Sequence, residues 1–220
     1  MTPPRAAPVV PDDEAGRARA VELLRAGGLV ALPTDTVYGI AVALDTPGGI
    51  GRLFAAKGRP PDKGIMLLLA DAAQAGEIGR ITPAAAALAD AFWPGGLTVV
   101  VPHAPGVDLP AELTAGTGTI GLRVPDHPAP RALATGVGPL PTTSANRSGF
   151  AEGRDAEDIL AQLGDAVDLV LDGGPAHGGP ASTVVDCTGD EAHILRVGAI
   201  PVERVVTVLD AVGVRVAVGR

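Results

Sequence analysis

Aromatic residues are scarce in this chain of 220 residues, which contains one Trp, one Tyr and three Phe. So few rings cannot build a stacking surface for single-stranded nucleic acid, and that class of protein is excluded. The hydrophobic core must therefore consist mainly of Ala, Val, Leu and Ile. Cysteine occurs once, at Cys187. A disulfide framework and a thiolate metal cluster are therefore excluded as well.

Long apolar runs and basic stretches are also missing. No segment reaches the length of a membrane span, and the N-terminal residues lack the apolar core of a signal peptide. We therefore expect a cytoplasmic protein that makes no membrane contact. The net charge of −8 argues against a broad nucleic-acid-coating surface. The four histidines show no metal-ligand spacing, so we expect no metal held by protein ligands.

Glycine and proline are abundant instead, with 30 and 21 residues respectively. Such a content is typical of low-complexity chains when no pattern accompanies it. Short apolar runs at 29–32, 65–70, 99–101 and 169–171 argue against disorder, because they have the length of buried strands. Glycine and proline are concentrated between these runs, as in ordinary turns and in loops near a ligand.

Helix and strand signals alternate along the whole chain. Capping residues and apolar spacing predict helices near 13–26, 46–57, 82–93, 126–135, 155–163 and 201–209. Strands are predicted at 29–33, 64–70, 97–101, 119–124, 169–171, 182–187 and 193–197. This order predicts one α/β domain at 13–210, a twisted mixed sheet flanked by helices, with tails at 1–12 and 211–220.

Lysine provides the sharpest chemical signal. The chain has only two lysines, Lys57 and Lys63, and they enclose Arg59 in the segment Lys57-Gly-Arg-Pro-Pro-Asp-Lys63. Three cations on a backbone rich in Gly and Pro would form a compact site for phosphates or carboxylates. A solvated basic loop is the alternative interpretation of the same segment.

Three further segments combine polar side chains with a strand end. Pro33-Thr-Asp-Thr-Val-Tyr-Gly39 follows a buried strand, at the place where open α/β sheets bind ligands. Pro141-Thr-Thr-Ser-Ala-Asn-Arg-Ser-Gly149 offers short hydroxyl and amide groups, which bind either an anion or the local backbone. Arg123 interrupts an apolar strand, so its guanidinium must reach either solvent or a buried anion.

Read in order, these segments resemble the YrdC-like domain of threonylcarbamoyl-AMP synthases, in its short single-domain form. These enzymes begin the formation of threonylcarbamoyl-adenosine in tRNA. The matching motifs are Pro33-Thr-Asp-Thr-Val-Tyr-Gly39, Lys57-Gly-Arg59, Phe92-Trp-Pro-Gly-Gly-Leu-Thr98, Arg123-Val-Pro125 with His127-Pro128, Thr143-Ser-Ala-Asn146 with Ser148-Gly149, Ser182-Thr-Val-Val-Asp186, and Leu195-Arg196 with Gly198. They extend over nearly the whole expected domain.

The resemblance implies a YrdC-like fold and a nucleotidyltransferase reaction. L-threonine, bicarbonate or CO₂, and ATP accompanied by Mg²⁺ would give threonylcarbamoyl-AMP and pyrophosphate. Other proteins would then transfer the threonylcarbamoyl group to tRNA.

The resemblance also implies a role for individual residues. Lys57 and Arg59 would be catalytic and would hold carbamate and phosphate oxygens. The residues implied to bind threonine are Thr36, Arg123, Thr142 and Ser182, with Arg123 pairing with the carboxylate. The residues implied to bind ATP are Arg59, Lys63, Thr119, Ser144, Asn146 and Arg196.

Three positions depart from the family pattern. Gly64 and Gly96 stand where family members commonly have Pro, and Leu68 stands where many have a His that contacts threonine. Gly64 and Leu68 keep open a related enzyme that forms a carbamoyl-adenylate with a different acceptor. An RNA-binding module is the third hypothesis, because a basic concavity of the family domain has been suggested to bind double-stranded RNA.

Overall fold

A single mixed sheet runs through the computed structural model, which describes residues 7–58, 64–176 and 179–218. Arg59 and Lys63 lie outside the described residues. The strands in chain order are β1 (Val9–Pro11), β2 (Val30–Leu32), β3 (Gly39–Ala41), β4 (Met66–Leu68), β5 (Leu97–Pro102), β6 (Thr119–Arg123), β7 (Leu140–Ser144), β8 (Leu169–Asp172), β9 (Thr183–Asp186), β10 (Glu191–Arg196) and β11 (Arg215–Val218). The helices are α1 (Glu14–Arg25), α2 (Gly49–Lys57), α3 (Ala73–Ile78), α4 (Pro83–Phe92), α5 (Ala111–Thr114), α6 (Pro128–Val137), α7 (Ala156–Leu163) and α8 (Val202–Ala211), with a short 3₁₀ helix at Gly164–Ala166.

Local capping explains where several helices begin. The Asp13 carboxylate accepts a hydrogen bond from the Gly16 amide at the start of α1, at 2.8 Å. Thr82 caps α4 in the same way, and Pro83 occupies its first helical position, where a missing N–H costs nothing. Asp155 caps α7. The six predicted helices all occur, with boundaries shifted by a few residues.

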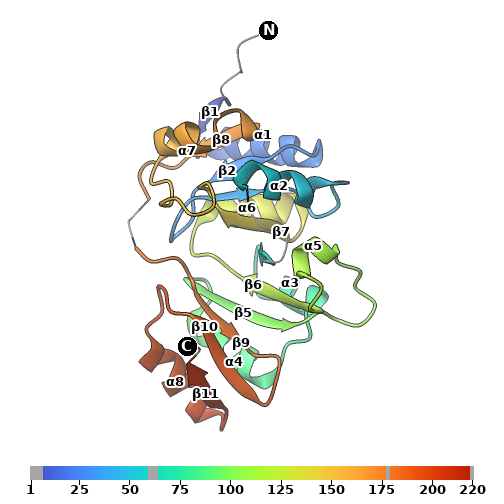
Figure 1. Ribbon diagram of the computed structural model, residues 1–220, viewed down its shortest axis with the longest axis vertical. Coiled ribbons are helices and arrows are strands. Elements are labelled where there is room, and N and C mark those ends of the chain that lie inside the picture. Colours follow the sequence, from blue (N-terminus) through green and yellow to red (C-terminus); the bar gives the residue numbers. More distant parts are fainter. Residues whose placement is uncertain (1–6, 59–63, 177–178, 219–220) are drawn as a thin grey trace.

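The strands are arranged in the order β1-β8-β2-β3-β7-β4-β6-β5-β9-β10-β11. Parallel and antiparallel pairs both occur, which confirms the predicted mixed α/β sheet. Two strands near the centre, β3 and β7, were not predicted. They pair with each other in antiparallel orientation, with Gly39 opposite Ser144. In Figure 1, β1 and β11 lie at opposite ends of the molecule, as expected for the two edges of the sheet.

The sheet extends beyond the expected domain limits at both ends. Val9–Pro11, within the expected N-terminal tail, forms β1 and pairs in parallel with β8. Arg215–Val218, within the expected C-terminal tail, forms β11 and pairs with β10. Both segments order because a paired neighbour satisfies their backbone groups, which is information that a local pattern does not carry.

Helices cover both faces of the sheet. Val30 and Leu32 of β2 belong to the apolar cluster with Leu24 of α1 and Leu133 of α6. Ala31, between them, belongs to the larger cluster that includes α2, α4, α7 and α8. This alternation follows from the period of two along a strand. Within the described ranges, the structure contains no helix long and apolar enough to cross a membrane.

Candidate active site

A cavity of about 410 Å³ lies over the middle of the sheet. Its floor exists because β5 and β6 carry large apolar residues on one face and small or polar residues on the other. Leu97 and Val99 of β5 are fully buried in the core, whereas Thr98 and Val100 line the cavity. Its size is in the range of small-molecule sites.

Strand register brings the floor residues side by side. Met66 of β4 lies opposite Thr142 of β7 and opposite Gly121 of β6, and Gly121 lies opposite Val100 of β5. Gly121 has no side chain to fill the cavity above this floor. An added Cβ there would lie 3.3 Å from a methyl group of Thr98. Residues from four strands, distant in sequence, therefore form one surface.

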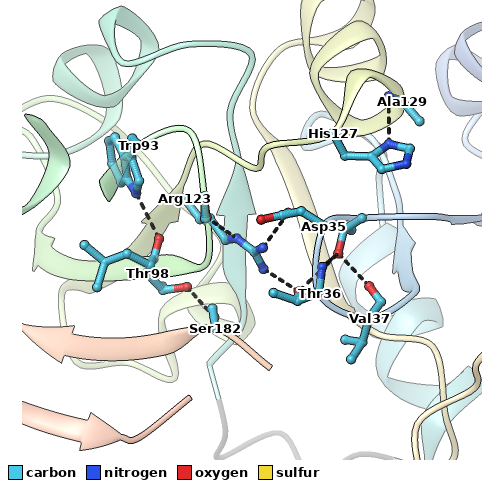
Figure 2. Close-up of polar contacts among 12 residues, drawn as sticks. Asp35, Thr36, Val37, Trp93, Thr98, Arg123, His127, Ala129 and Ser182 are labelled. Carbon is cyan, nitrogen blue, oxygen red and sulfur yellow. Dashed lines mark hydrogen bonds and ion pairs between the residues drawn. The ribbon is translucent and has the colours of Figure 1, made fainter. Parts of the chain in front are cut away.

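Arg123 lines the cavity as a buried cation, and Figure 2 shows its polar contacts with the neighbouring residues. Its guanidinium donates from Nη2 to Asp35 Oδ1 at 2.6 Å, from Nη1 to Thr36 Oγ1 at 3.0 Å, and from Nε to the Gly95 carbonyl at 3.0 Å. The Arg123 side chain is 3% exposed and that of Asp35 is 15% exposed. Desolvation lowers the pKa of Arg123, and the Asp35 carboxylate opposes that effect. An arginine nevertheless stays charged. Three of its five N–H groups have these partners, which leaves two without a hydrogen-bond partner among the described residues.

A second arginine approaches the cavity from β10. Arg196 donates from Nε to the Ser182 carbonyl at 2.9 Å and from Nη2 to Ser182 Oγ at 3.0 Å. Ser182 Oγ is also 2.8 Å from Thr98 Oγ1. Desolvation lowers the pKa of Arg196, Glu152 raises it, and the positive charge of Arg123 lowers it further. Both guanidinium groups thus place positive charge at the same cavity, and they favour an anionic ligand there.

Lys57 lies behind the cavity wall. Its ammonium donates to the carbonyl and Oδ1 of Asn146 at 2.7 and 2.9 Å, and to the carbonyl of Ser144. Ser144 Oγ donates to Asn146 Oδ1 at 2.7 Å. Lys57, at the end of α2, therefore fixes the end of β7, where Ser144 lines the cavity.

The structure brings most of the predicted site residues together. Those that line the cavity are Thr36, Thr119, Arg123, Thr142, Ser144, Ser182 and Arg196. Lys57 and Asn146 contact Ser144 from behind, and Arg59 and Lys63 lie outside the described residues. The individual roles implied for all these residues remain predictions.

Sequence reasoning missed several residues of the site. Asp35 and Gly95 were not assigned a role, although they hold Arg123. Thr98 and Glu152 were also missed, although both line the cavity. For Thr98 a signal existed: a polar residue alternates with buried Leu97 and Val99 in a strand, which indicates a polar opposite face. Glu152 lies in a loop and gave no such signal.

Comparison with known proteins identifies the family of this chain. The family model of Sua5, YciO and YrdC, described as "Telomere recombination", matches residues 22–198. The chain belongs to this family. The resemblance to the YrdC-like domain is thereby confirmed.

Relatives in the Sua5, YciO and YrdC family cover nearly the whole chain. A protein of Mycobacterium tuberculosis named "Putative threonylcarbamoyl-AMP synthase" is 40% identical over 195 residues, which are 88% of this chain and 89% of that protein. The crystal structure of P. abyssi Sua5 complexed with L-threonine has a TM-score of 0.85 at 31% identity. It matches 96% of this chain, which spans 62% of that one. E. coli YciO has a TM-score of 0.79 at 27% identity and matches 90% of this chain and 96% of its own. The predicted fold is confirmed by these structures.

Proposed function

We propose that this protein is an L-threonylcarbamoyladenylate synthase. It forms threonylcarbamoyl-AMP and pyrophosphate from L-threonine, bicarbonate or CO₂, and ATP, in the cytoplasm, for the modification of tRNA. The observation that carries the proposal is a cavity with two arginines, Arg123 and Arg196, and many hydroxyl groups, in a chain whose relatives are named for this reaction.

The buried end of the cavity suits an amino acid. Arg123 has two N–H groups available for the α-carboxylate, and such charge-assisted bonds are strong when desolvated. Thr36, Thr142 and Ser182 line the cavity and complete the proposed threonine site. The match to a threonine-complexed structure over 96% of this chain supports this assignment.

Arg196 occupies the more exposed part of the cavity, where we place the nucleotide. Ser144 and Thr119 line this cavity, and Asn146 positions Ser144. The base would rest on aliphatic side chains, such as Val184 and Leu195, because the cavity lining described here contains no aromatic residue.

The proposed reaction requires threonine, CO₂ and ATP to be held together in the cavity. The amine of threonine takes up CO₂ and loses a proton, which gives a carbamate. A carbamate oxygen then bonds to the α-phosphorus of ATP, and the bond from that phosphorus to pyrophosphate breaks. The main demands are positioning and neutralisation of negative charge, which Arg123, Arg196 and the proposed catalytic Arg59 would supply. The proposed catalytic Lys57, whose ammonium is bound to Asn146 behind the cavity wall, would add its positive charge from there. Lys63 would neutralise the triphosphate.

A magnesium ion fits this site as a companion of ATP. Mg²⁺ commonly keeps several waters and binds phosphate oxygens with one or two carboxylates at most. No group of three or more His, Cys, Asp or Glu residues in the described ranges is arranged to hold a metal ion. The ion would therefore be held mainly by the triphosphate, and it would supply further neutralisation of phosphate charge.

The decisive experiment measures pyrophosphate release and the mass of any adenylate with ATP, bicarbonate and each amino acid in turn. We expect threonine to give threonylcarbamoyl-AMP and the fastest release. Release with threonine no faster than with serine or with no amino acid would overturn the proposal.

The amino-acid panel also tests the alternative of a different acceptor, for which Leu68 and Gly64 were the motives. Leu68 is 1% exposed, belongs to the core cluster beneath α6, and does not line the cavity, whereas Gly64 lines it. A faster reaction with another amino acid would support that alternative. A salt-dependent RNA affinity without ATP turnover would support an RNA-binding module instead.

A further inference from the structure

One carboxylate of the cavity has no partner in the described part of the chain. Glu152 lies in the loop between β7 and α7, is half-buried and lines the cavity. It makes no hydrogen bond or ion pair with any residue that the structure describes. A carboxylate accepts hydrogen bonds and donates none when ionised, so a ligand group that faces Glu152 is favoured when it donates.

The neighbourhood of Glu152 restricts what that donor can be. Arg196 is its electrostatic neighbour, and both side chains line the cavity without forming an ion pair, so a ligand in the cavity can contact both. Arg196 is held in place by Ser182 and can bind a phosphate with its other N–H groups. A phosphate would be repelled by Glu152. The group facing Glu152 must therefore be uncharged or positive and lie next to a phosphate.

Two hydroxyl groups in the same cavity also act toward a ligand as hydrogen-bond acceptors. Ser144 Oγ donates its hydrogen to Asn146 Oδ1, so it offers only lone pairs to the cavity. Thr117 Oγ1 donates to the Thr114 carbonyl at 2.7 Å, so Thr119 Oγ1 must donate in its 2.7 Å contact with Thr117. Thr119 is therefore also an acceptor toward the ligand. The cavity thus offers acceptors that a nucleotide can match only with its hydroxyl or amino groups.

We propose that Glu152 accepts hydrogen bonds from the ribose hydroxyls of ATP and makes the site selective for ribonucleotides. The ribose is the uncharged group next to the α-phosphate, and its 2′ and 3′ hydroxyls can donate to one carboxylate. This inference rests on the proposed use of ATP. It adds a specificity-determining residue that the family motifs do not contain.

The test compares the affinities of ATP, 2′-deoxy-ATP, 3′-deoxy-ATP and ITP by isothermal titration calorimetry, with and without Mg²⁺ and always without threonine. We expect the wild-type protein to prefer ATP by about ten-fold or more, the size expected for a hydrogen bond to a charged group. Glu152→Ala should bind ATP and the deoxynucleotides with nearly equal affinity. Glu152→Gln should keep part of the preference, because its amide oxygen still accepts.

Two controls separate this role from a structural one. Glu157→Ala removes an exposed carboxylate from nearby α7 and should keep the wild-type preference. All three variants should keep the wild-type melting temperature, since Glu152 has no described partner to lose.

Three outcomes would overturn the inference. One is an undiminished preference for ATP over both deoxynucleotides in Glu152→Ala. Another is a changed preference between ATP and ITP alone, which would assign Glu152 to the amino group of the base. The third is a changed Mg²⁺ requirement with the ribose preference intact. Because the titrations need no threonine, a failure of threonine-dependent pyrophosphate release would overturn the proposed function separately.

Discussion

The ion pair between Arg123 and Asp35 makes a quantitative prediction for Asp35→Ala. This change leaves a guanidinium that is 3% exposed with Thr36 and the Gly95 carbonyl as its remaining partners in the described part of the chain. Breaking a fully buried pair costs about 3–5 kcal/mol, because the remaining charge is left uncompensated. Asp35 is 15% exposed, so water can replace part of the lost interaction. We therefore expect the free energy of unfolding to fall by about 3 kcal/mol, and Tm by roughly 6–12 °C for a chain of this size.

Urea unfolding followed by the fluorescence of Trp93 measures this loss. Trp93 is the single tryptophan and donates from Nε1 to the Leu97 carbonyl at the start of β5, so it reports on the same region. Asp190→Ala removes an exposed charge and is the matched control. In the double variant Arg123→Met, Asp35→Ala no charge is left unpaired, so much of the stability should return. A loss below about 1 kcal/mol, or strictly additive effects in the double variant, would refute the reasoning.

Three other predictions concern the surroundings of the site. Lys57→Met removes a buried ammonium that donates to oxygens at the end of β7, so the free energy of unfolding should fall by about 2–4 kcal/mol in urea titration; an unchanged value would contradict a clamping role. Gly198→Ala would place a Cβ 2.1 Å from a backbone oxygen, so it should sharply reduce soluble expression and Tm, whereas Gly189→Ala, whose nearest atom is 3.8 Å away, should leave both unchanged. Cys187 is fully buried, and desolvation raises the pKa of its thiol to about 12, so a thiol reagent at pH 8 should label it only after unfolding. Rapid labelling of the native protein would show that the Cys187 thiol is accessible and that this prediction is wrong.

Short-range signals predicted the helices well. Asp13, Thr82 and Asp155 each cap a helix by binding an amide three residues ahead, and such a contact is visible in a short window of sequence. The large buried strands were predicted for a similar reason, since a run such as Leu169–Asp172 is apolar enough to stand out. The central strands β3 and β7 were missed. Gly39–Ala41 and Leu140–Ser144 are short and contain Gly or Thr, and they become strands by pairing with each other and with β2 and β4 on either side.

The sequence by itself determined the family, the kind of fold and the residue types of the site, because ordered motifs and local periodicity persist without coordinates. The tertiary structure decided which of these residues meet. Arg123 binds Asp35 although 88 positions separate them, and Lys57 reaches Ser144 over 87 positions. It also decided which groups are already engaged, and it left Glu152 without a hydrogen-bond partner among the described residues. The physical reason is that hydrogen bonds and desolvation depend on distances across strands, which the order of residues along the chain does not specify.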